Sequence, residues 1–171
     1  MVADTTRVFP DVGGRNLEGR EFQLPGDLEG ELNLLMIAFQ RQHQSLVDSW
    51  MPAAAAWAAS HPRLHYYELP TISSGYRLFR GFIDGGMRGG IADVEARERT
   101  ITLYLDKDAF RSALGLADEE TIYVLLVDPG GTVFELVEGP YSEEKALSLE
   151  RGIEALLPES SPGSSVESDV Q

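Results

Sequence analysis

A nearly unbroken apolar run, Leu32–Phe39 (LNLLMIAF), constrains the fold of this chain more than any other segment. The run has the length of a β-strand and carries apolar residues on both of its faces. Such a strand must be covered on both sides, which is typical of the centre of a sheet packed between helices. The run therefore predicts an α/β protein in which residues 32–39 form a central strand.

The rest of the chain alternates between strand and helix patterns. Short apolar groups at 8–10 and 22–26 predict a strand or hairpin before the central strand. After the central strand, the sequence predicts a helix with apolar residues from 46 to 58 and a kink at Pro52, then a strand at 64–69 and a helical stripe from 76 to 87. A strand at 100–105 and a short helix at 108–116 follow. The last predicted elements are hairpin strands at 122–127 and 132–137 and a helix at 142–157. This order predicts a mixed central sheet with helices on both faces and an N-terminal hairpin.

The domain boundaries follow from composition. Residues 8–157 contain all the predicted elements and are expected to form one domain. Residues 1–7 are expected to be a flexible N-terminus. Residues 158–171 are rich in Ser, Pro and acidic residues, so we expect a disordered tail.

The charge balance limits the partners of this protein. The sequence holds 28 Asp and Glu against 14 Lys and Arg, for a net charge of −14. Nucleic acids and anionic membrane surfaces attract basic proteins, so both are unfavoured as partners. Only Lys107 and Lys145 are lysines, and an acidic, lysine-poor composition is typical of a salt-rich cell.

The sequence contains no cysteine, and this excludes several kinds of chemistry. Disulfides, thiolate metal ligands, thiol nucleophiles and dithiol redox cycles all need a cysteine side chain. The amino terminus lacks a basic region followed by an apolar stretch, and no apolar run approaches the 18 or so residues of a membrane span. A cytoplasmic location without membrane insertion is the expectation.

The spacing from Phe39 to Pro52 resembles that of the thioredoxin-like superfamily, in its peroxiredoxin and thiol-reductase variants. In those families a buried strand ends in an aromatic residue, a short loop leads to Cys-x-x-Cys at a helix amino terminus, and a proline follows five residues after the second cysteine. Here Gln44 and Val47 stand where the two cysteines would be. The resemblance implies a thioredoxin-like fold from which the redox cysteines are absent.

The carboxy-terminal half carries a second resemblance. The residues Phe110-Arg111, Leu114-Gly115, Tyr123–Asp128, Gly131, Gly139 and Ser142-Glu143-Glu144 are similar to the thioredoxin-like assembly-factor family of the mitochondrial ATP synthase and its bacterial relatives. In redox members of the superfamily a cis-proline precedes the closing hairpin. By spacing, that position falls near Thr121 in this chain.

The segment Gln40-Arg41-Gln42-His43-Gln44, called here the 40–44 segment, is the candidate binding site. Helix-terminal amides and Arg41 could hold an anion or a partner's carboxylate, and His43 adds a group that ordinarily titrates near neutrality. The alternative is a solvated loop with a helix cap. No catalytic residue, cofactor or metal is predicted.

Other polar groups have simpler interpretations. His61 and His65 are separated by Pro62, which breaks the helical geometry of a shared metal site. The glycines at 85, 86, 89 and 90 do not match a phosphate-binding motif and predict a flexible connection. Trp50 and Trp57 are predicted to belong to the core. Five arginines lie in the 77–99 stretch: Arg77, Arg80, Arg88, Arg97 and Arg99. They are expected to form internal ion pairs rather than a positive surface.

The leading hypothesis is a redox-inactive thioredoxin-like protein that acts as a binding or assembly module for a protein partner. The alternative is a small anionic-ligand binder, or a cysteine-independent enzyme, that works through Arg41 and His43. A third class is a scaffold for a cysteine on another chain. The sequence names neither the partner nor the oligomeric state.

Stability is expected to rise with salt concentration. Repulsion among the excess carboxylates opposes compaction, and salt shortens its range from about 10 Å at 0.1 M to about 3 Å at 1 M. The melting temperature, measured by calorimetry from low to molar NaCl, should climb. A flat or falling curve would remove the inference of a salt-rich cell.

Overall fold

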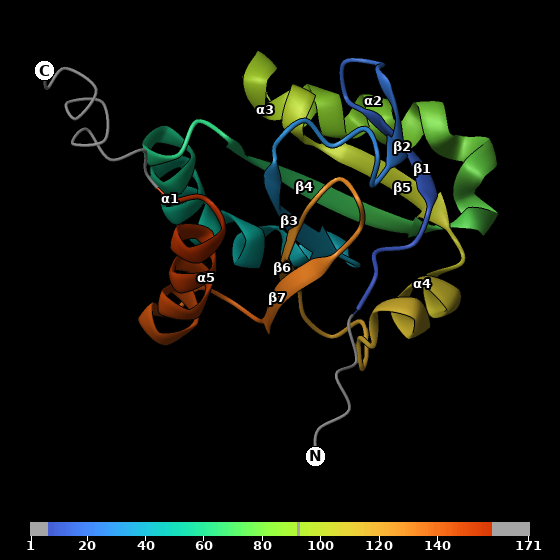
Figure 1. Ribbon diagram of the computed structural model, residues 1–171. Helices are drawn as coiled ribbons and strands as arrows, with labels where there is room; N and C mark the ends of the chain where they lie inside the picture. Colours follow the sequence, from blue (N-terminus) through green and yellow to red (C-terminus); the bar gives the residue numbers. More distant parts are fainter. Residues whose placement is uncertain (1–6, 92, 159–171) are drawn as a thin grey trace, which may run out of the picture.

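The computed structural model describes residues 7–91 and 93–158, and these form a seven-stranded mixed sheet with helices on both faces (Figure 1). The expected flexible N-terminus and disordered tail fall almost wholly outside the described residues. The strands are β1 (Val12–Asn16), β2 (Glu21–Leu24), β3 (Leu32–Ala38), β4 (Leu64–Ser73), β5 (Ile101–Leu105), β6 (Tyr123–Val127) and β7 (Val133–Glu138). The helices are α1 (Gln44–Ser60), α2 (Arg80–Gly90), α3 (Val94–Arg99), α4 (Lys107–Leu114) and α5 (Glu143–Leu156), with short 3-10 turns η1 (Arg41–His43) and η2 (Ser74–Phe79).

The strand β3 lies inside the sheet, as its apolar sequence predicts. The strand order is β2-β1-β5-β4-β3-β6-β7, and β3 pairs in parallel with β4 and antiparallel with β6. In this register Met36 lies between Glu68 and Val124. All seven residues of β3 are buried, so both faces of the strand are covered.

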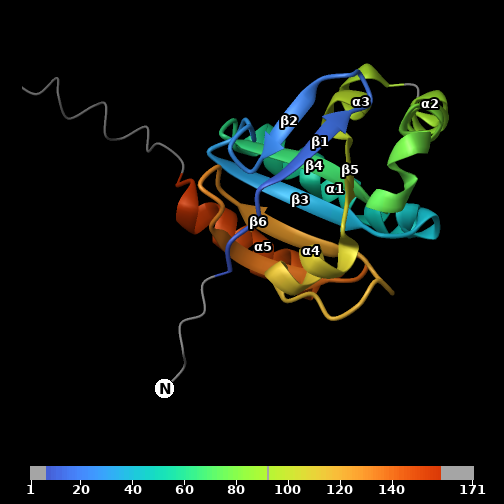
Figure 2. The same ribbon diagram turned by 90° about the vertical axis from the view of Figure 1, so that its right-hand side faces the viewer.

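Two apolar cores lie on opposite faces of the sheet. On one face α1 and α5 cover β3 with Val47, Trp50, Leu149 and Ile153. On the other face α4 and the N-terminal segment contribute a core that includes the edge-to-face pair Phe9 and Phe110. Figure 2 shows α4 and α5 beside β6 from the side. The sheet therefore has helices on both faces.

The two tryptophans belong to the core, as predicted. Trp50 is fully buried, its ring centroid is 6.5 Å from that of Trp57, and its Nε1 donates a hydrogen bond to the Gly139 carbonyl at 3.0 Å. The bond ties α1 to the loop between β7 and α5.

The two hairpins of the chain form the two edges of the sheet. The β6–β7 hairpin is confirmed, with Gly131 at a φ of 99°, which favours glycine. At the other edge β1 and β2 form the N-terminal hairpin, which joins the sheet through antiparallel pairing of β1 with β5. The expected strand at 8–10 is reduced to a single bridge from Val8 to Thr132. The last helix begins after Ser142, whose hydroxyl accepts a hydrogen bond from Lys145 N.

The prediction of a flexible connection at the glycines 85, 86, 89 and 90 is wrong, because these residues lie within α2. The inward residues of α2 explain why a helix forms despite the glycines. Ile83 and Met87 are half-buried, and Asp84 accepts a hydrogen bond from the Tyr104 hydroxyl of β5 at 3.0 Å. The outward residues are different: wherever the structure describes burial in α2, the exposed residues are five glycines and Phe82.

Replacing Gly85 and Gly89 with alanine should stabilise the protein. A Cβ at either position meets no heavy atom within 4 Å among the described residues, and glycine in a helix interior is less favourable than alanine by about 0.5–1 kcal/mol per residue. The free energy of unfolding in urea should therefore rise. No change, or a loss of stability, would contradict a helix at these residues.

Candidate functional site

The 40–44 segment lies at the carboxyl end of the central strand β3. The turn η1 covers Arg41–His43, and α1 begins at Gln44, so Gln44 stands at the start of the helix as predicted. The helix continues through Pro52 to Ser60. No side chain caps the amino terminus of α1, and no acidic residue lies in its first turn. Instead, the turn η1 leads into the helix, and the carbonyls of Gln40 and Arg41 accept hydrogen bonds from His43 N and Gln44 N. The positive end of the helix dipole is not offset by a nearby carboxylate in the first turn.

His43 is buried and holds the segment to its neighbours. Its Nδ1 accepts a hydrogen bond from Phe39 N at 3.2 Å, and its ring also bonds to the backbone of Glu120. Burial lowers the pKa of His43, which favours the neutral imidazole. The sequence suggested His43 as a ligand group that titrates near neutrality. In the structure His43 instead positions the segment, because both of its ring nitrogens form hydrogen bonds inside the protein.

The loop before β6 is brought against the 40–44 segment. Gln40 donates a hydrogen bond from Nε2 to the Glu119 carbonyl, and Gln42 donates one to Gln40 Oε1. Thr121 follows in the same loop and is half-buried. The structure thus places Gln40 and His43 beside the residues that precede Thr121.

Gln44 is engaged by two carboxylates. Its Nε2 donates a hydrogen bond to Asp48 Oδ1 at 3.0 Å, one turn further along α1, and its side chain also bonds to Glu68 of β4. At the position where the thioredoxin-like redox pattern places the first cysteine, this chain therefore has an amide held between two acids.

Glu68 is a site residue that the sequence analysis missed. Its side chain is only 6% exposed, on the face of the sheet that α1 covers. Burial raises the pKa of Glu68 to about 7, the negative charge of Asp48 adds to the rise, and the hydrogen bond from Gln44 opposes it. The available signal was a single acid inside a predicted strand, at the same alternation as the apolar Leu64 and Tyr66.

Arg41 differs from its neighbours because it is exposed and its side chain makes no hydrogen bond or ion pair with the described residues. Its guanidinium group is thus free to meet an external carboxylate or phosphate. Two cavities of about 540 and 560 Å³ are lined by other residues. The 40–44 segment therefore presents one cationic side chain that no described residue engages.

The remaining candidate residues, His61 and His65, make contacts within the protein. His61 Nδ1 lies 3.1 Å from the Trp57 carbonyl, and His65 Nδ1 lies 3.9 Å from Glu29, so the three histidines do not meet. In the described ranges no three His, Cys, Asp or Glu side chains are grouped to hold a metal ion. None of the described helices is long and apolar enough to cross a bilayer.

The arginine-rich stretch forms ion pairs wherever the structure describes its side chains. Arg80 lies 3.9 Å from Asp84, Arg99 lies 4.0 Å from Glu95, and Arg97 pairs closely with Glu18. The side chains of Arg77 and Arg88 lie outside the described part. The interpretation as internal ion pairs is supported for these three arginines.

Comparison with known proteins identifies the fold. No family model and no curated protein matches the sequence. The structure is similar to BsSco, a member of the Sco family of cytochrome c oxidase assembly proteins, with a TM-score of 0.63 and 10% identity over 91% of this chain and 96% of BsSco. It is also similar to the thioredoxin domain of a thiol-disulfide oxidoreductase from Bacteroides vulgatus, with a TM-score of 0.52 and 17% identity over 89% and 99% of the two chains. A third match is the exposed lipoprotein thioredoxin of Streptococcus pneumoniae, with a TM-score of 0.53 and 15% identity over 84% and 99%.

These likenesses define a thioredoxin-like α/β fold. The chain has a thioredoxin-like fold and contains no cysteine. Its amide-centred site has no group that can form a thiolate or a mixed disulfide.

The buried carboxyl of Glu68 should make stability depend on pH. Between about 4.5, the ordinary pKa, and about 7, the folded protein keeps a proton that the unfolded chain has released, so the free energy of unfolding should fall as pH rises through this window, by up to about 3 kcal/mol. In Glu68→Gln this slope should be lost, so the free energy of unfolding of the variant, relative to that of the wild type, should be higher at pH 8 than at pH 5. Urea unfolding at pH 5 and pH 8 measures both.

The matched control is Glu154→Gln, which removes an exposed carboxylate of α5. It should keep the wild-type slope. If Glu68→Gln also keeps it, then the Glu68 carboxyl does not take up a proton on folding and its environment is more polar than the structure indicates.

Proposed function

We propose that this protein is a redox-inactive thioredoxin-like module that binds a protein partner, in an assembly or chaperone-like role. The observation that carries the proposal is Gln44, which occupies the position of the nucleophile and is bonded to Asp48 and Glu68. A site whose central side chain is an amide bonded to acids of the same protein offers no thiolate to a substrate. What remains is a fold with an available surface.

Two further observations support a protein partner. Wherever burial is described in α2, the exposed residues are five glycines and Phe82, none of which is charged, in a chain of net charge −14, and Phe82 is 85% exposed. Exposed apolar faces of this kind are commonly covered by other proteins. BsSco, one of the similar structures, belongs to a family of assembly proteins, and the carboxy-terminal residues of this chain resemble an ATP synthase assembly-factor family.

The second candidate function is binding of a small anion, and Arg41 is the observation that favours it. The exposed guanidinium lies beside an uncapped helix amino terminus, where an anion is favoured. His43 is buried and bonded within the protein, whereas Arg41 lies at the surface, and this favours a contact with a partner's carboxylate over an enclosed small molecule. The cysteine-independent enzyme has less support, since His43 is committed to positioning.

The protein should show no disulfide reductase or peroxidase activity. Insulin reduction and peroxide consumption by the purified chain should match buffer, because no side chain can form the thiolate. Turnover that rises in proportion to the amount of purified chain would overturn the redox-inactive part of the proposal.

The partner surface is tested with proteins that the full-length chain retains from native cell extract at high salt. Each retained protein is purified and titrated against wild type, Arg41→Ala and Phe82→Glu. Arg41→Ala should weaken binding by about 1.5–3 kcal/mol if a partner's carboxylate meets Arg41 away from water. Phe82→Glu should weaken binding if the α2 face is covered.

Arg151→Ala is the control, since Arg151 is an exposed arginine of α5. It should bind like wild type. If every partner binds Arg41→Ala and Phe82→Glu as tightly as wild type, both surfaces are inert. If no purified protein binds at all while inorganic phosphate shifts the amide resonances of the 40–44 segment, the anion-binding function replaces the module.

A further inference from the structure

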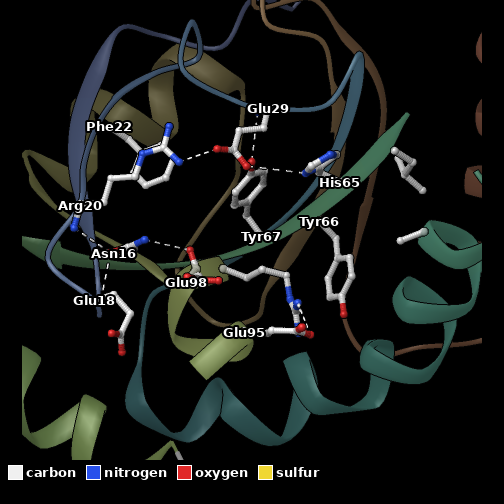
Figure 3. A pocket seen from close by; sticks show the side chains of 13 residues that line it. Asn16, Glu18, Arg20, Phe22, Glu29, His65, Tyr66, Tyr67, Glu95 and Glu98 are labelled. Carbon is white, nitrogen blue, oxygen red and sulfur yellow. Dashed lines mark hydrogen bonds and ion pairs between the residues drawn. The ribbon is translucent and has the colours of Figure 1, made fainter. Parts of the chain in front are cut away.

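A second site lies at the opposite end of the sheet from the 40–44 segment. A cavity of about 540 Å³, called here the Tyr67 cavity, opens between the β1–β2 hairpin, the amino end of β4 and α3 (Figure 3). Its volume is in the range of small-ligand sites. Because β3 and β4 are parallel and the 40–44 segment follows the carboxyl end of β3, the two sites lie at opposite ends of these strands.

The lining of the Tyr67 cavity carries an excess of negative charge. Four carboxylates, those of Glu18, Glu29, Glu95 and Glu98, line the cavity together with the guanidiniums of Arg20 and Arg99. Glu18 pairs with Arg97, which lies outside the lining. Counted with Arg97 and without His65, these groups carry a formal charge of −1. Glu95 and Glu98 lie across the cavity from Glu29 (Figure 3).

The cations of the lining are already engaged, whereas one carboxylate is not. Arg20 pairs closely with Glu29, and Arg99 lies 4.0 Å from Glu95. The Glu98 carboxylate makes no hydrogen bond or ion pair with any other described residue. An anion entering the cavity would meet occupied arginines and a free carboxylate. A cation would meet the free carboxylate directly.

The aromatic rings of the cavity hold its own arginines in place. The Arg20 guanidinium lies over the Phe22 ring at 4.3 Å, and the Arg99 guanidinium lies over the Tyr66 ring at 4.4 Å. These ring faces are therefore covered, and Glu98 is the group of the lining that a further cation can meet. Tyr67 is 3% exposed and is fixed in place, because its hydroxyl accepts a hydrogen bond from Glu29 N at 3.1 Å.

Asn16 organises the walls before any ligand arrives. This side chain is 4% exposed, and its Oδ1 accepts hydrogen bonds from the backbone N–H groups of Glu18 and Arg20, at 3.0 and 2.9 Å. Its Nδ2 donates to the Glu98 carbonyl at 3.2 Å. One buried amide thus fixes the backbone at three charged residues of the cavity. A site that is already ordered loses less entropy when it binds.

We propose that the Tyr67 cavity binds an organic cation, an alkylammonium or guanidinium group on an apolar stem. The group comes either from a free amine or from a basic side chain of a protein segment. The proposal is independent of the 40–44 segment and of the redox-inactive module, since it uses none of the same residues.

The probes are arginine amide and citrulline amide, which have nearly the same shape and differ in the guanidinium charge. Titration of the full-length chain, followed by NMR of amides around the cavity, should show binding of arginine amide and much weaker binding of citrulline amide. Glu95→Gln/Glu98→Gln should weaken arginine amide binding by at least about threefold, which corresponds to the upper range for exposed charge pairs. Raising salt should weaken binding in the wild type.

The control variant Glu120→Gln/Glu144→Gln removes the same charge from exposed positions outside the cavity lining and should bind like wild type. A blocked tetrapeptide with one arginine distinguishes the sources: tighter binding than arginine amide assigns the site to a protein segment, and equal binding assigns it to a free amine. The proposal is overturned if citrulline amide binds equally well, if both double variants weaken binding equally, or if inorganic phosphate binds there instead.

Discussion

The burial of β3 on both faces is the constraint from which the rest of the structure follows. All seven residues of the strand are covered, so the chain must supply an apolar layer on each side of the sheet. Even the single polar residue of β3, Asn33, is fully buried, and its amide is bonded to the Gly30 and Val127 carbonyls. Because β3 is fixed in this way, the chain that leaves it at Ala38 has a defined position and direction. The 40–44 segment and the start of α1 depend on this anchor.

Local patterns were enough to predict the elements that depend on nearby residues. The central strand, the β6–β7 hairpin and the Ser142 cap each follow from residues within a few positions of one another, whereas the start of α1 at Gln44 followed from the Phe39–Pro52 spacing. The glycines of α2 misled the prediction because glycine disfavours helices on its own. The contact of Asp84 with Tyr104, twenty residues away, is not visible in the local sequence.

The candidate site was predicted only in part for the same reason. Its position after the central strand followed from the sequence, and Arg41 is exposed there. The roles of His43 and Gln44 depend on residues that are distant in the sequence. The loop at Glu120 reaches His43 through the pairing of β3 with β6, and Glu68 reaches Gln44 through the pairing of β3 with β4. The sequence pattern gave the residue types at this site but not the hydrogen bonds that decide which of them are available.

The acids around Gln44 also limit how this protein could be converted into an oxidoreductase. A cysteine introduced at position 44 would sit at a helix amino terminus, which favours a thiolate. It would also face Asp48 and Glu68, whose negative charges disfavour one. Restoring the two thiols at 44 and 47 would therefore be insufficient for an active dithiol. Engineered redox activity would require the carboxylates of Asp48 and Glu68 to be replaced as well.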